Sequence, residues 1–231
     1  MTRIIDASPR LKRKQLPLAD PALDYRPAGP SLLGQTDMLL LYSAVAAQMT
    51  DEPSRIIELA SATRGEGTST VARELALTIA GSLSKPVLLI RAINDLPLRP
   101  GLEAAAYGRI PLEAAIETDL QVPSLAMATL SLGGPNAGLL FDGDELDRIF
   151  AQAARRAKLI IIDAPPILSD VTGIALSRKA TGVLLVVEAE RTRAPIIEQA
   201  RKVIETGGGR LLGVILNKRK HHIPDWIYKL L

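Results

Sequence analysis

Apolar and polar positions follow two distinct patterns along the middle of this chain. Several short runs are continuously apolar, such as "KLIIIDAPP" and "GVLLVVEAE", which is typical of strands buried on both faces of a sheet. Between them, apolar residues recur at every third or fourth position, as at Val71, Leu75 and Ile79, which is typical of a helix with one buried face. The apolar runs predict strands over residues 55–61, 85–92, 124–131, 158–166, 182–190 and 210–218. The periodic stretches predict helices over residues 35–49, 69–83, 111–117, 142–157, 171–178 and 194–206, with a loop over residues 92–108.

The alternation of strands with helices predicts the fold class. Continuously apolar strands separated by helices indicate a doubly wound α/β fold with a mostly parallel sheet. We expect one such domain over residues 35–217, because the sequence contains neither an internal repeat nor a second domain. Residues 1–34 are basic, rich in proline and without periodicity, so we expect a flexible arm. Residues 218–231 are expected to form a basic, amphipathic tail.

The composition limits the kinds of catalytic and metal site that the protein could have and the cellular compartment in which it is expected. Hydrophobic residues make up 47% of the 231 residues and aromatic ones only 3%, which is ordinary for a soluble protein with an aliphatic core. The chain has no cysteine and only two histidines, which argues against disulfides, thiolate metal sites and histidine-based catalysis. No apolar run reaches the roughly 20 residues of a membrane span, and the N-terminus lacks the apolar segment of a secretion signal. We therefore expect a cytoplasmic protein.

Charge is distributed unevenly along the chain. The net charge is +3, yet residues 1–34 and residues 218–231 each carry +3, so the body between them is mildly acidic. An acidic body is a poor match for the phosphate backbone, and we expect no nucleic-acid binding. The basic ends could contact anionic lipid headgroups peripherally, but solvated tails are the simpler interpretation.

A glycine-rich turn, "ASATRGEGTSTVA", joins the first predicted strand to the next helix. Phosphate-binding loops have the pattern (A/G)-x-x-x-x-G-K-(S/T); Ala62, Gly67 and Ser69 fit it, whereas Thr68 occupies the lysine position. Glycines let the backbone approach an anion, and the N-terminus of the following helix would direct its dipole there. A βα turn that needs glycine only for its backbone angles is the alternative. The expected nucleotide-binding residues of this loop are Arg64, Gly65, Glu66, Gly67, Thr68, Ser69 and Thr70.

Asp163 ends the apolar run "LIIID" and would therefore lie at the carboxyl end of a buried strand. Ligands of open α/β sheets bind at that edge. A carboxylate there can hold the Mg²⁺ of a nucleotide through water, and the hydroxyl of Ser69 can bind the ion directly. We expect Ser69 and Asp163 as metal-binding residues, although a solvated acid after a strand is the simpler alternative.

Together these motifs resemble the cytoplasmic ATPase domain of bacterial tyrosine kinases and related capsule and exopolysaccharide proteins. That family is a branch of the deviant P-loop group that includes the MinD and ParA ATPases. The resemblance covers residues 35–220 and rests on "GEGTSTVA" where the family has GEGKST, on "KLIIIDAPPILSD", and on "GVLLVVEAERTR" followed by "LLGVILNK". It implies ATP or ADP and Mg²⁺ as cofactors, and it implies that Asn217 contacts the adenine base.

The sequence departs from the family pattern at two places. The second strand of the family ends in a D-x-D motif whose acids serve the metal and the attacking group. Here Arg91 occupies the first acidic position, and Asp95 is the nearest acid downstream. The kinases of the family also end in a tyrosine-rich tail, whereas Tyr228 stands alone near the end of this chain. Both departures favour weak or no kinase activity.

An arginine could replace the lost loop lysine. Phosphoryl transfer depends on positioning and on neutralisation of developing charge, so loss of a central cation weakens both binding and rate. Strand order places Arg91 near the same edge of the sheet as the loop, and Arg64 lies within the loop. We hypothesise that one of them supplies part of the missing charge; an arginine that extends into solvent from a strand end is the alternative. The expected catalytic residues are Asp163, Arg91 and Asp95.

The leading interpretation is a P-loop ATPase-like protein of exopolysaccharide or capsule biosynthesis and export, with weak or lost nucleotide turnover, as in a pseudokinase. The resemblance implies that it acts beside an inner-membrane polysaccharide co-polymerase, or chain-length protein; a homo-oligomer is compatible with the sequence. One alternative is an active ATPase or protein-tyrosine kinase in which an arginine replaces the lysine. A second is a ParA- or MinD-like positioning ATPase.

Overall fold

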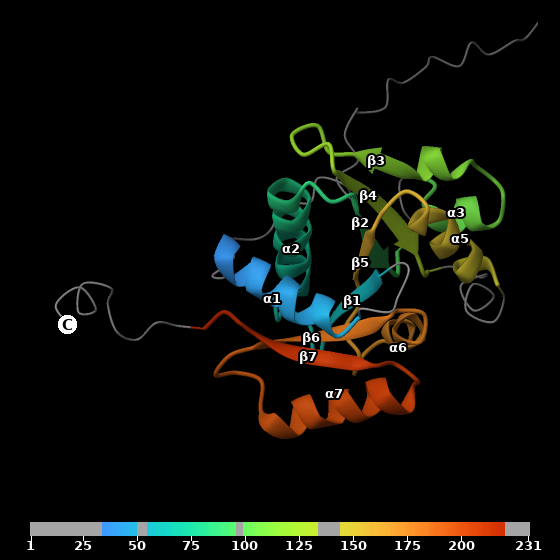
Figure 1. The fold of residues 1–231 in the computed structure, drawn as a ribbon. Helices are drawn as coiled ribbons and strands as arrows, with labels where there is room; N and C mark the ends of the chain where they lie inside the picture. The colour runs from blue at the N-terminus through green and yellow to red at the C-terminus, as the bar shows by residue number, and fades with distance from the viewer. Residues whose placement is uncertain (1–33, 50–54, 96–98, 134–143, 220–231) are drawn as a thin grey trace, which may run out of the picture.

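The computed structural model describes residues 34–49, 55–95, 99–133 and 144–219, which form a seven-stranded sheet with helices on both faces (Figure 1). The strands are β1 (Arg55–Ser61), β2 (Val87–Ile93), β3 (Ile116–Thr118), β4 (Leu125–Ser131), β5 (Leu159–Asp163), β6 (Gly182–Glu188) and β7 (Leu211–Asn217). The helices are α1 (Gln35–Ala47), α2 (Thr68–Leu83), α3 (Leu102–Ala106), the 3₁₀ turn η1 (Leu112–Ala115), α5 (Glu145–Ala154), α6 (Val171–Ser177) and α7 (Ala194–Thr206). Outside the described residues lie the predicted arm, apart from Gly34, most of the predicted tail, and Tyr228.

The strand order in the sheet is β3-β4-β2-β5-β1-β6-β7. Every pairing is parallel except that of β3 with β4. This arrangement confirms the predicted doubly wound, mostly parallel P-loop type of fold. Because parallel strands all end at one edge of the sheet, the chain segments that follow β1, β2, β5 and β7 meet there.

Two short segments differ from the prediction. The helix predicted over residues 111–117 is instead the turn η1 followed by strand β3, whose Ile116 pairs with Ala128 of β4. A three-residue strand is too short to show a periodicity, and it is defined by its pairing with the strand that follows it in the chain. The loop predicted over residues 92–108 contains the one-turn helix α3. The remaining elements agree with the prediction to within three residues at either end.

Each face of the sheet is covered through its own apolar cluster. On one face, α1 and α2 pack against β1 side chains such as Ile57 and Leu59. On the other face, α3, α5, α6 and α7 contribute buried residues that include Phe150 and Leu176. Strand β1 is therefore enclosed on both faces, which fixes the starting point of the loop that follows it (Figure 1).

No helix in the described part of the chain combines the length and the apolar character needed to cross a membrane.

Glu58 is a fully buried carboxylic acid within this core. It lies on β1 between Ile162 of β5 and Val183 of β6, both of which belong to an apolar cluster. Among the described residues neither carboxylate oxygen has a hydrogen-bond partner, and the nearby hydroxyl of Ser177 donates to Gly173 O instead. Burial raises the pKa of Glu58 to about 8, against a weaker opposing effect of Ser177, because the apolar surroundings disfavour the charged form. The core therefore holds this side chain as a neutral acid at neutral pH.

This burial predicts that the protein loses stability as pH rises. Below pH 4.5 the carboxyl is neutral in both the folded and the unfolded state, so it adds no pH dependence. Between pH 4.5 and about 8 the unfolded chain ionises while the folded one does not, so the free energy of unfolding falls. We expect a loss of about 3–5 kcal/mol across this range relative to Glu58→Gln, measured by urea denaturation at each pH. The exposed substitution Glu113→Gln should leave the slope unchanged; parallel curves for wild type and Glu58→Gln would contradict the prediction.

Candidate functional site

A cavity of about 790 Å³ opens at the carboxyl edge of the sheet. It lies between the loop after β1 and the ends of β2, β5 and β7, so distant parts of the sequence share one wall. The residues predicted for the site that line this cavity are Arg64, Gly65, Gly67, Thr68, Ser69, Thr70, Arg91, Asp95, Asp163 and Asn217. Glu66 does not line it. The structure therefore brings together nearly all of the residues that the sequence singled out.

Gly65 and Gly67 of the loop are required for different structural reasons. Gly65 and Gly67 both adopt left-handed backbone angles, with φ of 86° and 91°. A Cβ at Gly65 would meet no atom within 4 Å, whereas a Cβ at Gly67 would overlap Nδ2 of Asn217. Gly65 is thus required only for its backbone angles, while Gly67 is required for its angles and for the close approach of β7.

The lysine position of the loop coincides with the start of α2. Thr68 is the first residue of this 16-residue helix and is buried, and no acidic residue follows in the first turn. The free N–H groups at a helix N-terminus carry a partial positive charge that favours anions. Thr68 adds a hydroxyl but no charge, so the positive potential here comes from the main chain and from neighbouring side chains.

Asp163 and Arg91 lie side by side at the ends of adjacent strands. Asp163 of β5 pairs with Leu59 of β1 on one side and with Arg91 of β2 on the other. Paired residues of parallel strands project to the same face, and both side chains line the cavity. The arginine in the position of the expected acid therefore sits next to the aspartate of the "DAPP" motif, which is itself 5% exposed.

The cavity wall carries both signs of charge. Its cations are Arg64, Arg91 and Lys218, and its carboxylates are Asp95, Asp163 and Asp170. In the described part of the chain, no group of three or more histidine and acidic side chains could hold a metal ion by itself. Mg²⁺ in nucleotide sites takes only one or two protein ligands and completes its shell with water and phosphate oxygens. The hydroxyl of Ser69 and the carboxylate of Asp163, on the walls of one cavity, suit an ion that arrives with a nucleotide.

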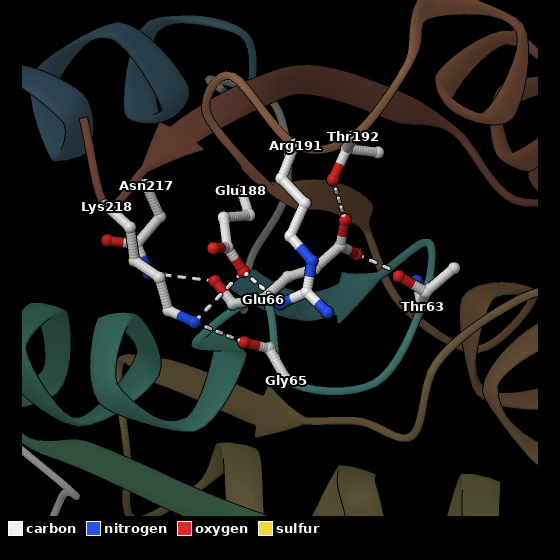
Figure 2. A network of polar contacts seen from close by, with 8 residues as sticks. All are labelled: Thr63, Gly65, Glu66, Glu188, Arg191, Thr192, Asn217 and Lys218. Atoms are coloured by element: carbon white, nitrogen blue, oxygen red, sulfur yellow. Dashed lines mark hydrogen bonds and ion pairs between the residues drawn. The ribbon is translucent and has the colours of Figure 1, made fainter. Parts of the chain in front are cut away.

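Glu66, which does not line the cavity, holds the loop through its side chain. Its side chain is only 2% exposed, and its carboxylate accepts hydrogen bonds from the backbone N–H of Thr63, at 2.8 Å, and from Oγ1 of Thr192 (Figure 2). Thr192 lies in the turn between β6 and α7. The predicted part of Glu66 in nucleotide binding would therefore involve its main chain, since the Glu66 side chain holds the loop in place.

Polar residues at this edge that were absent from the predicted site include Asp170, Asn94, Lys218 and Glu188. Asp170 caps α6 by accepting from Thr172 N at 3.0 Å, and Asn94 donates to its carboxylate. The pattern "SDVT" is a recognisable helix-start signal that could have identified Asp170. Lys218 and Glu188 form an ion pair of 3.1 Å beside the loop. Hydrogen bonding by Lys218, aided by Arg191 and opposed by partial burial, lowers the pKa of the Glu188 carboxyl.

Comparisons with known proteins agree with this architecture, although no family model matches the chain. The tyrosine-protein kinase CpsD of Streptococcus agalactiae serotype III is 27% identical over 188 residues, covering 78% of this chain and 81% of the relative. The kinase domain of the Escherichia coli tyrosine kinase ETK superposes with a TM-score of 0.72 at 23% identity, covering 82% of this chain and 78% of that one. The cell division protein MinD of Aquifex aeolicus gives a TM-score of 0.58 at 22% identity, covering 76% and 72%.

The two glycines offer a matched pair of substitutions. We expect Gly65→Ala to cost about 1 kcal/mol of unfolding free energy, because only left-handed strain is introduced. Gly67→Ala should cost about 2–3 kcal/mol, because the new methyl group also collides with Asn217. Urea denaturation at one pH measures both. Equal losses would mean that the approach of Asn217 does not constrain the loop.

Proposed function

Since this chain belongs to the bacterial tyrosine-kinase family, which is related to MinD and ParA, we propose that its cavity is an adenine-nucleotide site without the usual loop lysine. One observation carries the proposal. The left-handed glycines, the N-terminus of α2 and Asp163 line one cavity, while Thr68 stands where the lysine would be. The main chain of the loop then holds the phosphates, and the charge of a lysine is missing.

In this proposal, different residues of the cavity bind the phosphates, the Mg²⁺ ion and the base of the nucleotide. The amides from Gly65 to Thr70 face a developing or bound phosphate charge, and Ser69 and Asp163 hold Mg²⁺. Bound Mg²⁺ supplies neutralisation of phosphate charge. Asn217 contacts the base. Arg91 and Arg64 contribute positive charge, and Asp95 stands in for the altered second acidic motif.

We expect slow or absent turnover at this site. Removing one strong electrostatic contact to a transition state commonly costs about 3–4 kcal/mol, or a hundredfold or more in rate. Loss of the lysine and of the first acid of the second motif removes two such contacts. Binding that persists without rapid turnover suits a protein that acts by association.

At the cellular level we propose a role in exopolysaccharide or capsule biosynthesis and export. The protein would work as a peripheral, ATPase-like partner of an inner-membrane chain-length protein, as the family resemblance implies. An active kinase or ATPase is the first rival and predicts phosphate release or phosphotyrosine. A ParA-like positioning ATPase is the second rival and predicts nucleotide-dependent binding to DNA.

Purified full-length protein mixed with labelled ATP, with and without Mg²⁺, tests the proposal. We expect Mg²⁺-dependent binding with little phosphate release and no phosphotyrosine. Thr68→Lys should tighten binding by about tenfold or more, because it restores an ammonium beside the loop. Thr206→Lys, at the far end of α7, adds the same charge away from the cavity and should change nothing. Absence of binding in both wild type and Thr68→Lys would refute the nucleotide site, and rapid turnover by wild type would favour the kinase.

Arg91→Ala tests whether the arginine beside Asp163 contributes to binding. We expect the affinity for MgADP to fall by about three- to tenfold, because a cation at the phosphate edge is lost. Arg148→Ala, on the exposed side of α5, removes an equal charge elsewhere and serves as the control. An unchanged affinity in Arg91→Ala would remove this residue from the site.

A further inference from the structure

Two successive side chains at the end of β7 donate hydrogen bonds to the backbone of the loop (Figure 2). Asn217 Nδ2 donates to the backbone oxygen of Glu66 at 2.9 Å, and Lys218 Nζ donates to that of Gly65 at 2.5 Å. Two consecutive peptide groups of the loop are therefore held from the same side. Neither contact follows from the phosphate-loop pattern, which concerns the residues of the loop alone.

These two hydrogen bonds determine where the loop amides point. In a trans peptide the C=O and the N–H project in opposite directions, and the described residues contain no cis peptide bond. Since the oxygens of Gly65 and Glu66 face β7, the N–H groups of Glu66 and Gly67 face away from it. In the sheet, β5 and β2 lie on the far side of β1 from β7. The amides therefore point toward the side on which Asp163 and Arg91 line the cavity.

The positions of Asn217 and Lys218 are themselves fixed by contacts with their surroundings. Asn217 is 5% exposed and pairs with Glu188 of β6, whose carboxylate binds Nζ of Lys218 at 3.1 Å. Lys218 has φ of 56°, an angle that non-glycine residues adopt at a cost and that is retained where the surroundings enforce it. The Glu66 carboxylate also binds Thr192, which lies in the turn that follows β6. The end of β7 and the turn after β6 therefore both hold the loop, through side chains that have further partners of their own.

We infer that Asn217 and Lys218 are positioning residues that pre-organise the anion-binding amides of the loop and so offset part of the loss of the lysine. The inference rests on the proposed nucleotide site and assigns to Lys218 a role that its sequence position does not reveal. Donors that are already oriented bind an anion without the cost of ordering the loop. The ion pair of Lys218 with Glu188 is partly exposed and would contribute little by itself, so its value lies in holding the ammonium on Gly65.

Two substitutions of Lys218 separate its hydrogen bond from its charge. Lys218→Gln retains an N–H donor but has no charge, whereas Lys218→Met has similar length and no donor. Lys202→Met is the matched control, because Lys202 is an exposed α7 lysine paired with Glu198. Hydrogen exchange of residues 63–70 in the free protein reports loop order without any nucleotide. Titration with MgADP and with inorganic tripolyphosphate reports the binding of phosphates.

We expect Lys218→Met to exchange about tenfold faster in the loop and to bind both ligands about tenfold more weakly. Lys218→Gln should stay within about threefold of wild type in both exchange rate and affinity. The control Lys202→Met should give the same exchange rate and affinity as wild type. Unchanged exchange in Lys218→Met would overturn the inference, and so would an equal loss in Lys218→Gln, which would assign the effect to charge. If wild type binds neither ligand, the proposed nucleotide site fails, while the exchange measurement still decides whether Lys218 orders the loop.

Discussion

The parallel pairing of β5 between β1 and β2 is the interaction on which the site depends. Its register places Leu59, Asp163 and Arg91 in one row at the carboxyl edge of the sheet. A shift of one residue would turn Asp163 to the opposite face, because side chains alternate along a strand. The same row fixes the start of the glycine loop, since β1 is buried on both faces. The cavity exists because these strands end together.

The loop shows how main-chain and side-chain contributions to a site can be lost separately. Threonine at position 68 leaves the loop without the cation of the usual lysine, whereas the positions of its amides depend on two glycines, a helix terminus and contacts from β7. Shape therefore persists after charge is reduced. Phosphate binding can tolerate this change better than phosphoryl transfer can, because catalysis depends most on charge that develops in the transition state.

Strand β1 carries a second electrostatic feature on its other face. Glu58 precedes the loop by a few residues and lies in an apolar cluster with no described hydrogen-bond partner. A buried carboxyl costs stability once it ionises, and in this chain the cost falls on the strand that positions the site.

The sequence by itself determined the fold class and the edge of the sheet at which most of the candidate residues gather, because local patterns along the chain are enough to predict both. Continuous apolar runs identify buried parallel strands, and strand ends in such a sheet share an edge, so the loop, Arg91, Asp163 and Asn217 could be expected there. Only the tertiary structure revealed β3, which its pairing with β4 creates, and the outward orientation of the Glu66 side chain. It also revealed Lys218, whose side chain turns back onto Gly65 because of a backbone angle and a carboxylate on β6. Contacts between particular side chains and between separate elements leave no periodicity in the sequence, which is why these features required the folded arrangement.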